Sequence, residues 1–401
     1  MNPSSPPMQG MAKRPSLFTL IILIALASTA AVLYTPGIPD IQRQFHVSLD
    51  AVHWTMTIFL IGYAFGQLIY GPLANRIRRK PTLYIGIAVG IIGSLLSAIS
   101  GVFHNFSVLL IGRFLQAIGM SCGLAMTLTM INDVYTHEES RRVIAFTSSA
   151  FAILPGLAVY VGGILVSYFH WESTFYFLAL YSLFVLGLCI LLPETSPHID
   201  ITALQLKNII RHYWQVSRSM RVWCYSLMWG LCTTMIYIFA SVAPTIAIST
   251  MKLPPAMFGA FNLIPSSGIL IGTLSSGIFA RHYKARTIML IGIILTSLAC
   301  LALLLFSQLG QLTPWTLFLP TFCIYLGTPA IVSNASALIT KNIIDKATVS
   351  SLLSFINVST AVIGLFVIGL IPGNPEHILP EVFITIALCF IFLFSVTRRW
   401  Q

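Results

Sequence analysis

The segment GPLANRIRRK, residues 71–80, ends one long apolar run and leads into another. Neither run, at 52–73 and at 82–102, contains a lysine, arginine, aspartate or glutamate. An α-helix needs ~20 apolar residues to cross the hydrocarbon core of a bilayer, and each run is long enough. Short basic loops between such helices are typical of the cytoplasmic side of a membrane. The segment therefore predicts the inner turn of a transmembrane helical hairpin.

The same alternation of apolar runs and short polar joints continues along the whole chain. Its 401 residues are 57% hydrophobic and only 8% charged, whereas a soluble protein carries about 25% charged residues. Most of the surface must therefore face lipid, and the sequence predicts an all-α integral membrane protein with 12 transmembrane helices in two six-helix bundles. The runs lie at 17–36, 52–73, 82–102, 107–131, 143–169, 173–192, 222–249, 256–280, 287–307, 314–338, 347–371 and 378–397.

The net charge of +11 is a topology signal and predicts no nucleic-acid partner. Of the 22 lysines and arginines, Arg43 and Lys252 fall on one predicted side and Arg113 falls inside a run; all others lie on the side of the N-terminus. The positive-inside rule then places that side, with both termini, in the cytoplasm of an inner (plasma) membrane.

These patterns divide the chain into five parts. We expect a disordered cytoplasmic N-terminus at 1–16, a six-helix bundle at 17–192, a cytoplasmic linker at 193–220, a second six-helix bundle at 221–397 and a cytoplasmic tail at 398–401. The seven cysteines form no CxxC pair and lie in or beside apolar runs, so they read as packing residues. No metal constellation, phosphate loop or nucleophile–base pattern stands out, which predicts neither an enzyme nor a cofactor.

A glycine pattern repeats between the two halves. Gly62, Gly66 and Gly71 run into the basic loop, and the same spacing recurs 206 residues later at Gly268, Gly272 and Gly277, before Arg281, Lys284 and Arg286. Glycines at helical spacing let two helices approach closely. The repeat therefore predicts duplicated six-helix units.

Residues 71–80 resemble the loop signature between helices two and three of the major facilitator superfamily. Residues 110–119, LIGRFLQAIG, are similar to the fourth-helix motif of that family. The resemblance implies a carrier that works by alternating access, with a gating role for Gly71, Asn75, Arg76, Arg79 and Lys80. Two residues depart from the signature, because Asn75 stands where the family usually has Asp and Arg78 where it usually has Gly.

Arg113 is the sharpest single candidate, because a charge within an apolar run is costly. It is predicted to bind an anion or to take part in proton relay, the role that the family resemblance implies; the alternative is snorkelling to the outer interface. Gln116, one turn away, is predicted to orient Arg113, to contact substrate or to join helices.

Residues 34–39, YTPGIP, and the predicted fifth helix resemble one branch of drug exporters, the bicyclomycin and chloramphenicol type. There Pro155 and the pair Gly162 and Gly163 keep the spacing of the exporters, and Pro155 is expected to bend the helix. That branch often carries an acidic residue in helix one, and Val32 stands at the matching place. Asp133 and His53 are the alternative titratable groups.

Polar and aromatic residues on several helices are predicted to line a mostly apolar central cavity. They are Tyr34, Tyr63, Gln67, Tyr160, Trp229, Tyr237, Asn262, Tyr325 and Asn357. Such a cavity favours small amphipathic substrates, and the leading hypothesis is drug export by a monomeric, proton-coupled carrier in the lipid bilayer. The alternatives are a dedicated exporter of a metabolite or siderophore-like compound, a nutrient uptake carrier, and a sensor or scaffold.

Overall fold

The computed structural model describes residues 14–196, 219–340 and 346–397. In these residues all the regular structure is helical. The first group of elements comprises α1 (Leu17–Ile24), α2 (Leu26–Val32), η1 (Thr35–Gly37), α3 (Ile38–Phe45), α4 (Leu49–Ile77), α5 (Arg79–Ile99), α6 (Phe106–Met120), α7 (Cys122–Val134), α8 (His137–Tyr168) and α9 (Glu172–Ile190). The second comprises α11 (Met220–Pro244), η2 (Thr245–Thr250), α12 (Pro255–Phe279), α13 (Ala285–Gln308), α14 (Pro314–Thr340), α15 (Lys346–Ile368) and α16 (Pro375–Val396).

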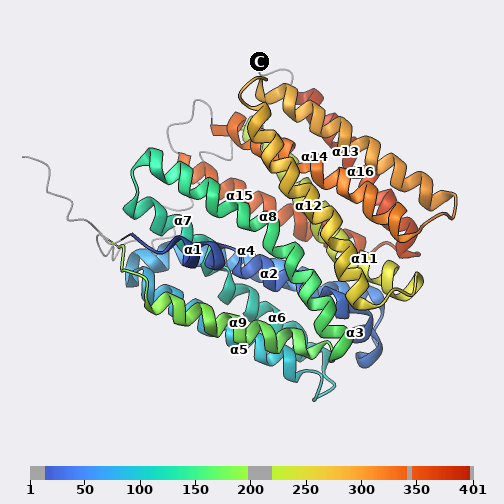
Figure 1. Ribbon diagram of the computed structural model, residues 1–401, viewed down its shortest axis with the longest axis horizontal. Coiled ribbons are helices and arrows are strands. Elements are labelled where there is room, and N and C mark those ends of the chain that lie inside the picture. The colour runs from blue at the N-terminus through green and yellow to red at the C-terminus, as the bar shows by residue number, and fades with distance from the viewer. Residues whose placement is uncertain (1–13, 197–218, 341–345, 398–401) are drawn as a thin grey trace, which may run out of the picture.

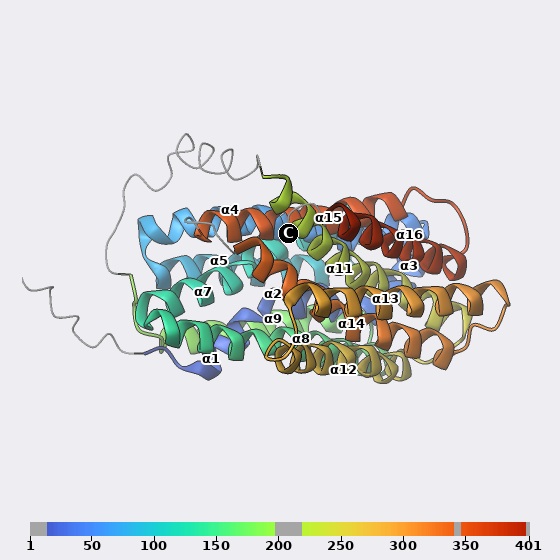
Figure 2. The ribbon, with the colours of Figure 1, turned by 90° about the horizontal axis from the view of Figure 1, so that it is seen from above.

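The helices run roughly alongside one another and form two bundles. Within the first group α5 packs against α6 and α9, and within the second α13 packs against α14 and α16. The groups meet along two seams, where α8 packs against α12 and α4 packs against α15. Figures 1 and 2 show these seams on opposite flanks of the molecule. The predicted fold of two helical bundles is therefore confirmed.

Ten helical segments of the described residues are long and apolar enough to cross a bilayer. Two shorter apolar stretches, Ile153–Tyr168 in α8 and Phe355–Ile368 in α15, lie where the two remaining runs were expected. The count of 12 spans itself stays a prediction. The first span differs from expectation, because it does not end near residue 36 but continues through η1 and α3 to Phe45.

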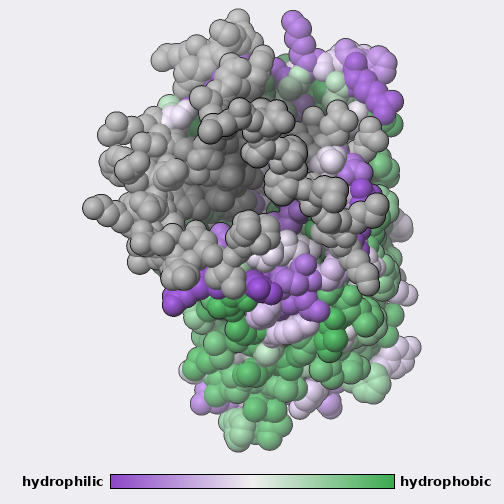
Figure 3. Space-filling model, turned by 90° about the vertical axis from the view of Figure 1, so that its left-hand side faces the viewer, coloured by the Kyte–Doolittle hydropathy of each residue, from purple (hydrophilic) through white to green (hydrophobic). Residues whose placement is uncertain are grey.

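The two ends of the molecule have different compositions. We call the end that holds the segment Arg76–Lys80 and the start of α8 the basic end, and the opposite end, where α3 lies, the α3 end (Figure 1). Figure 3 looks at the molecule from its left-hand side, where hydrophilic residues border a broad hydrophobic flank. An apolar flank of this kind is expected of helices surrounded by lipid.

The glycine repeat occupies matching places in the two groups. A Cβ on Gly62 would lie 2.6 Å from the carbonyl oxygen of Phe114, and a Cβ on Gly268 would lie 2.6 Å from that of Phe322. In both groups the second glycine also meets backbone oxygen of the same neighbouring helix, whereas the third has open space. The first two glycines of each set thus allow close packing of α4 on α6 and of α12 on α14.

Candidate functional site

The site begins where the first span breaks. Pro36 has no N–H to continue the helical ladder, and the hydroxyl of Thr35 instead donates to the carbonyl of Val32 at 2.8 Å. Ala30 and Ala31 lie in the last turn of α2, where carbonyl groups lack partners further along the helix. The break therefore leaves a pair of carbonyl oxygens available to another donor, at the partly negative end of a helix dipole.

Arg113 supplies that donor from α6. Its Nη1 donates to the carbonyl of Ala30 at 2.9 Å, and its Nη2 to that of Ala31 at 3.4 Å. Its Nε donates to the carbonyl of Thr55 in α4 at 3.3 Å. The side chain is fully buried, at 0% exposure. It does not snorkel, and one guanidinium joins α2, α4 and α6.

Aromatic rings enclose the guanidinium. Its central carbon lies 4.1 Å from the ring centre of Tyr34, 4.2 Å from that of Phe59 and 5.8 Å from that of Phe175. The Tyr34 hydroxyl is 2.7 Å from the hydroxyl of Thr55, so this ring is held in place. Rings and carbonyls stabilise a cation without neutralising it. In the described residues no salt bridge reaches Arg113.

Gln116 extends the contact to a fourth helix. Its Oε1 accepts from Arg113 Nη1 at 2.6 Å, and its Nε2 donates to the hydroxyl of Ser94 in α5 at 2.8 Å. The amide is fully buried. Gln116 therefore orients Arg113 and also joins helices, two of its three predicted roles; substrate contact by Gln116 stays a prediction.

The other polar residues predicted for the cavity fall into two sets. Tyr63 and Gln67 lie one turn apart on α4, and Tyr237 of α11 lies close enough to Tyr63 to affect it electrostatically from the second group. In contrast, Tyr325 is buried within the second group, where its hydroxyl donates to the carbonyl of Ile236 at 3.4 Å. The first set spans the contact between the groups.

Two asparagines predicted to line the cavity differ in their hydrogen bonding. The side chain of Asn262 in α12 is buried, and its own carbonyl accepts from Ser266. Asn357 in α15 has a buried Oδ1 that finds no hydrogen-bond partner among the described residues. An unpartnered buried acceptor suits a donor from outside the protein, so Asn357 is retained as a predicted substrate contact. A role in substrate binding for Asn262 stays a prediction.

The fifth-helix glycines face in two directions. A Cβ on Gly162 would lie 1.8 Å from the carbonyl oxygen of Leu33, just past α2. A Cβ on Gly163 would lie 2.4 Å from the carbonyl oxygen of Pro255, the first residue of α12. Gly162 therefore packs on the broken first span and Gly163 on the opposite group. Pro155 lies inside α8, and the expected bend there stays a prediction.

The expected gating loop forms a network at the basic end. Arg79 Nε donates to Asp133 Oδ2 at 3.0 Å, and Arg79 Nη1 donates to Asn75 Oδ1 at 2.6 Å. Thr195 also donates to Asp133, at 2.9 Å. Asp133 was a candidate for proton transfer, and the structure places its carboxylate in this network. Arg76 is exposed, as a purely topological charge would be.

Glu194 is a member of this network that the sequence interpretation missed. Its carboxylate accepts from the backbone N–H groups of Arg79 and Lys80, both at 3.1 Å, at the start of α5. An anion at a helix N-terminus satisfies unpaired donors and the helix dipole. Lys80 Nζ in turn donates to the carbonyl of Ile190 at 3.0 Å. The available signal was an acidic residue directly after a predicted span.

Arg78 adopts the backbone conformation of a glycine. Its φ of 76° and ψ of 169° lie in a region that residues with a Cβ rarely occupy. This is the position at which the family signature usually has Gly. The tight turn between α4 and α5 is thus kept, at the expense of backbone strain in Arg78.

A capping box starts α8 at the same end. The side chains of Thr136 and Glu139 each accept from the backbone N–H of the other, and Arg14 donates to Glu139 at 2.9 Å. The bond from the Thr136 N–H lowers the pKa of Glu139, and the Arg14 guanidinium lowers it further. The cap therefore holds its carboxylate form at neutral pH.

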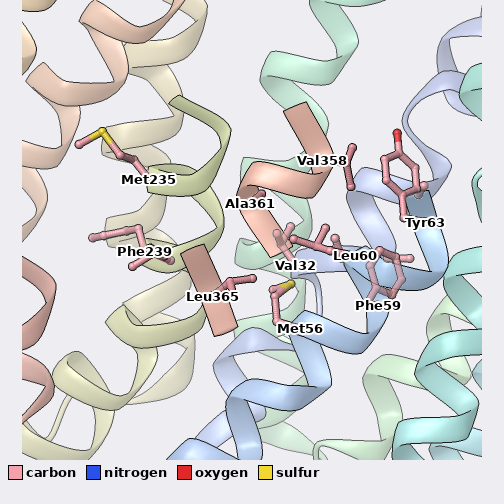
Figure 4. Packing of buried hydrophobic residues seen from close by; sticks show 14 of the residues in the cluster. Val32, Met56, Phe59, Leu60, Tyr63, Met235, Phe239, Val358, Ala361 and Leu365 are labelled. Atoms are coloured by element: carbon pink, nitrogen blue, oxygen red, sulfur yellow. The ribbon is translucent and has the colours of Figure 1, made fainter. Parts of the chain in front are cut away.

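The position in the first span at which the drug-exporter branch often has an acidic residue lies in apolar surroundings. Figure 4 shows Val32 beside Leu60 of α4, in a region that also holds Met56 of α4 and Leu365 of α15. All four side chains belong to one buried apolar cluster. The first span thus contributes a small apolar side chain to a cluster that both groups share, at the place where the drug-exporter branch often has a carboxylate.

Comparison with known proteins gives the class. The model of the Major Facilitator Superfamily matches residues 20–368. The chain belongs to this superfamily, whose members are transporters and not enzymes.

Relatives by sequence include an uncharacterized transporter of Rickettsia bellii (strain RML369-C), 29% identical over 296 residues that cover 73% of this chain and 72% of that protein. A bicyclomycin resistance protein homolog of Haemophilus influenzae is 26% identical, with 80% of each chain covered. Multidrug resistance protein D of Escherichia coli is 24% identical over 78% of this chain and 77% of that protein.

Solved structures share the fold. A D-xylose-proton symporter superposes with a TM-score of 0.76 at 13% identity, covering 93% of this chain and 96% of that one. The inward open conformation of the xylose transporter XylE from E. coli gives 0.74 at 12% identity, covering 94% and 95%. At these identities the likeness supports the fold and not the substrate.

Proposed function

We propose that this transporter exports small amphipathic compounds in exchange for protons by alternating access. The basic end faces the cytoplasm, because it carries most lysines and arginines. The two bundles, 17–192 and 221–397, rock about a site between them, and the linker at 193–220 joins them.

The observation that carries the proposal is the state of Arg113. A fully buried guanidinium with neutral partners is an expensive group within a membrane. It lies against the broken end of α2, and Val32 of that helix reaches the contact with the second group (Figure 4). A cation at this place is suited to respond to a substrate or proton bound between the bundles. A sensor or scaffold has no use for it.

The described contacts between the bundles close the α3 end. The Ala256 N–H donates to Ser167 Oγ at 2.8 Å, which joins the ends of α8 and α12 at the α3 end. Trp54 and Phe366 meet edge to face there, with ring centres 5.7 Å apart. Closure of this end is expected of an inward-facing carrier, one of the two states that alternating access requires.

The substrate class follows from the groups offered between the bundles. Tyr63, Gln67 and Tyr237 offer hydroxyl and amide groups, and Asn357 has an unpartnered acceptor. Neutral hydrogen-bonding groups in apolar surroundings favour amphipathic compounds of low charge. The drug-resistance names of two relatives support efflux.

A second candidate is a dedicated exporter of one endogenous compound. It is favoured by Val32, because this apolar residue stands where the branch that this chain resembles often carries an acidic residue, which weakens the case for carboxylate-based drug:proton antiport.

Everted membrane vesicles test the proposal. Vesicles energised to acidify the lumen receive a panel of amphipathic drugs and metabolites, and a pH-sensitive dye follows the lumen. We expect a compound-triggered proton efflux that is lost in Arg113→Met and kept in the matched control Arg43→Met, an exposed arginine of α3. Efflux that survives in Arg113→Met would overturn the role of Arg113. A response to a single metabolite only would favour the dedicated exporter.

A further inference from the structure

A buried histidine joins the two bundles at the α3 end. His53 lies in the second turn of α4, and its Nδ1 is 2.6 Å from the hydroxyl oxygen of Ser241 in α11, 188 residues away in the chain. His53 is 5% exposed and Ser241 is fully buried. The hydrogen bond therefore crosses the contact that seals this end.

Among the residues that the structure describes, one charged group acts on His53. This group is the carboxylate of Asp50, one turn earlier on α4. Its side chain is exposed, but its negative charge is close enough to act on the imidazole. The neighbouring segments present uncharged groups: Ser241 from α11, Leu365 and Phe366 from α15, and Gly369 just past its end. A cavity of about 20 Å³ lies between Asp50, His53 and the residues at the end of α15, with room for about one water molecule. A proton from the α3 end therefore has a short route to the ring.

The chemistry of imidazole makes this bond sensitive to protons. A neutral imidazole shares one proton with the Ser241 hydroxyl, and burial in an apolar contact suits it. An imidazolium carries a charge, and no salt bridge to His53 is formed in the described residues. Burying that charge is unfavourable, whereas an imidazolium exposed to water beside Asp50 is well solvated. The sealed state thus prefers neutral His53, and protonation prefers separation of the bundles.

We propose that His53 and Ser241 form a pH-sensitive latch on the outer gate, which acid on the α3 side releases. The word "outer" rests on the proposed function, in which the α3 end faces the outside of the cell. The bond between His53 and Ser241 and its response to acid do not depend on that function. An exposed histidine titrates within the physiological range. The ratio of open to sealed molecules then rises as external pH falls, by up to about tenfold per pH unit for a single proton.

Distance measurement between spin labels tests the latch without any substrate. Labels on Val102→Cys and Leu309→Cys, which are exposed at the α3 end of the two bundles, are introduced after replacement of the seven native cysteines. In lipid nanodiscs between pH 8 and pH 5, we expect the population with the longer distance to grow. His53→Asn is expected to abolish this growth, because its amide occupies the place of Nδ1 but gains no charge.

Two further variants secure the interpretation. His170→Gln removes an exposed histidine from the same end and is expected to leave the titration unchanged. Ser241→Ala removes the partner of His53 and is expected to raise the open population already at pH 8. A distance distribution that does not change with pH in the unsubstituted chain, or that changes equally in His53→Asn, would overturn the latch. This experiment measures distances and not transport. A failure of the proposed drug export would therefore not affect its outcome.

Discussion

Arg113 donates to the carbonyl of Ala30 across 2.9 Å, and through this bond the fourth span is fastened to the broken end of the first. The two features depend on each other. The break supplies carbonyl groups at the negative end of a helix dipole, and these groups stabilise a cation that would otherwise be isolated. A movement of either span must therefore change the environment of the guanidinium.

Replacing Arg113 with lysine should not restore function. Lysine carries the same charge, but a single ammonium cannot reach Thr55, Ala30, Ala31 and Gln116 together. We expect Arg113→Lys to lose transport in the vesicle assay and to lower the free energy of unfolding by about 1–3 kcal/mol for each buried acceptor left unpaired. Thermal unfolding in detergent measures the second effect. Wild-type transport with lysine would show that charge alone suffices.

Glycine in place of Arg78 should stabilise the chain. The φ of 76° at this residue is strained for any side chain with a Cβ and relaxed for glycine. We expect Arg78→Gly to raise the free energy of unfolding by about 1–3 kcal/mol.

Arg76→Gly is the control for this variant, because Arg76 lies in the last turn of α4. There glycine lowers stability by about 1 kcal/mol relative to ordinary helix residues. Both variants remove one positive charge from the same loop, so opposite shifts in melting temperature separate backbone strain from charge. Equal shifts would contradict the strain at Arg78.

The glycine repeat predicts paired effects in the two bundles. A Cβ at Gly62 or Gly268 would press on a backbone oxygen of the neighbouring helix, so we expect Gly62→Ala and Gly268→Ala each to destabilise by about 1–3 kcal/mol. Gly71→Ala and Gly277→Ala meet open space inside a helix and should stabilise by about 0.5–1 kcal/mol. Expression level and melting temperature report both. Destabilisation by all four changes would remove the parallel between the bundles.

The carboxylate of Asp133 should matter more than an exposed one. Asp133→Asn leaves the nearly buried Arg79 without a counter-charge, and we expect a loss of about 1.5–3 kcal/mol in the free energy of unfolding. Asp40→Asn breaks an exposed pair with Arg43 and should change it by less than about 1 kcal/mol. Chemical denaturation of the purified protein checks the difference. A similar small loss in both would mean that the Arg79 pair contributes little.

The overall fold was readable from the chain because lipid imposes simple rules. Apolar runs between basic loops predicted the bundle architecture, and the spacing that Gly62 shares with Gly268 predicted the duplication. The costly position of Arg113 also marked it without any knowledge of its neighbours. In each case the signal lies in a short stretch of sequence.

The partners of these residues were not readable, because they come from distant segments or from the backbone. The alanines at positions 30 and 31 do not indicate that their backbone carbonyls accept hydrogen bonds from an arginine. His53 and Ser241 are 188 residues apart, so their contact is not visible in the sequence. The sequence also did not reveal that the ring of Tyr34 lies over Arg113, whereas its expected place in a cavity stays a prediction. Arg78 shows the same limit, since a departure from the family signature concealed an unchanged turn.

Three glycines bring main chain and small side chains together in the seam between α8 and α12. Gly163 meets Pro255, Gly259 meets the backbone of residues 159 and 160, and Gly156 meets Ser266. If the bundles rock about this seam as proposed, its backbone contacts place no chemical requirement on the substrate. Side chains elsewhere between the bundles can then change selectivity without altering the motion. Engineering of selectivity should accordingly spare these three glycines and vary the walls beside them.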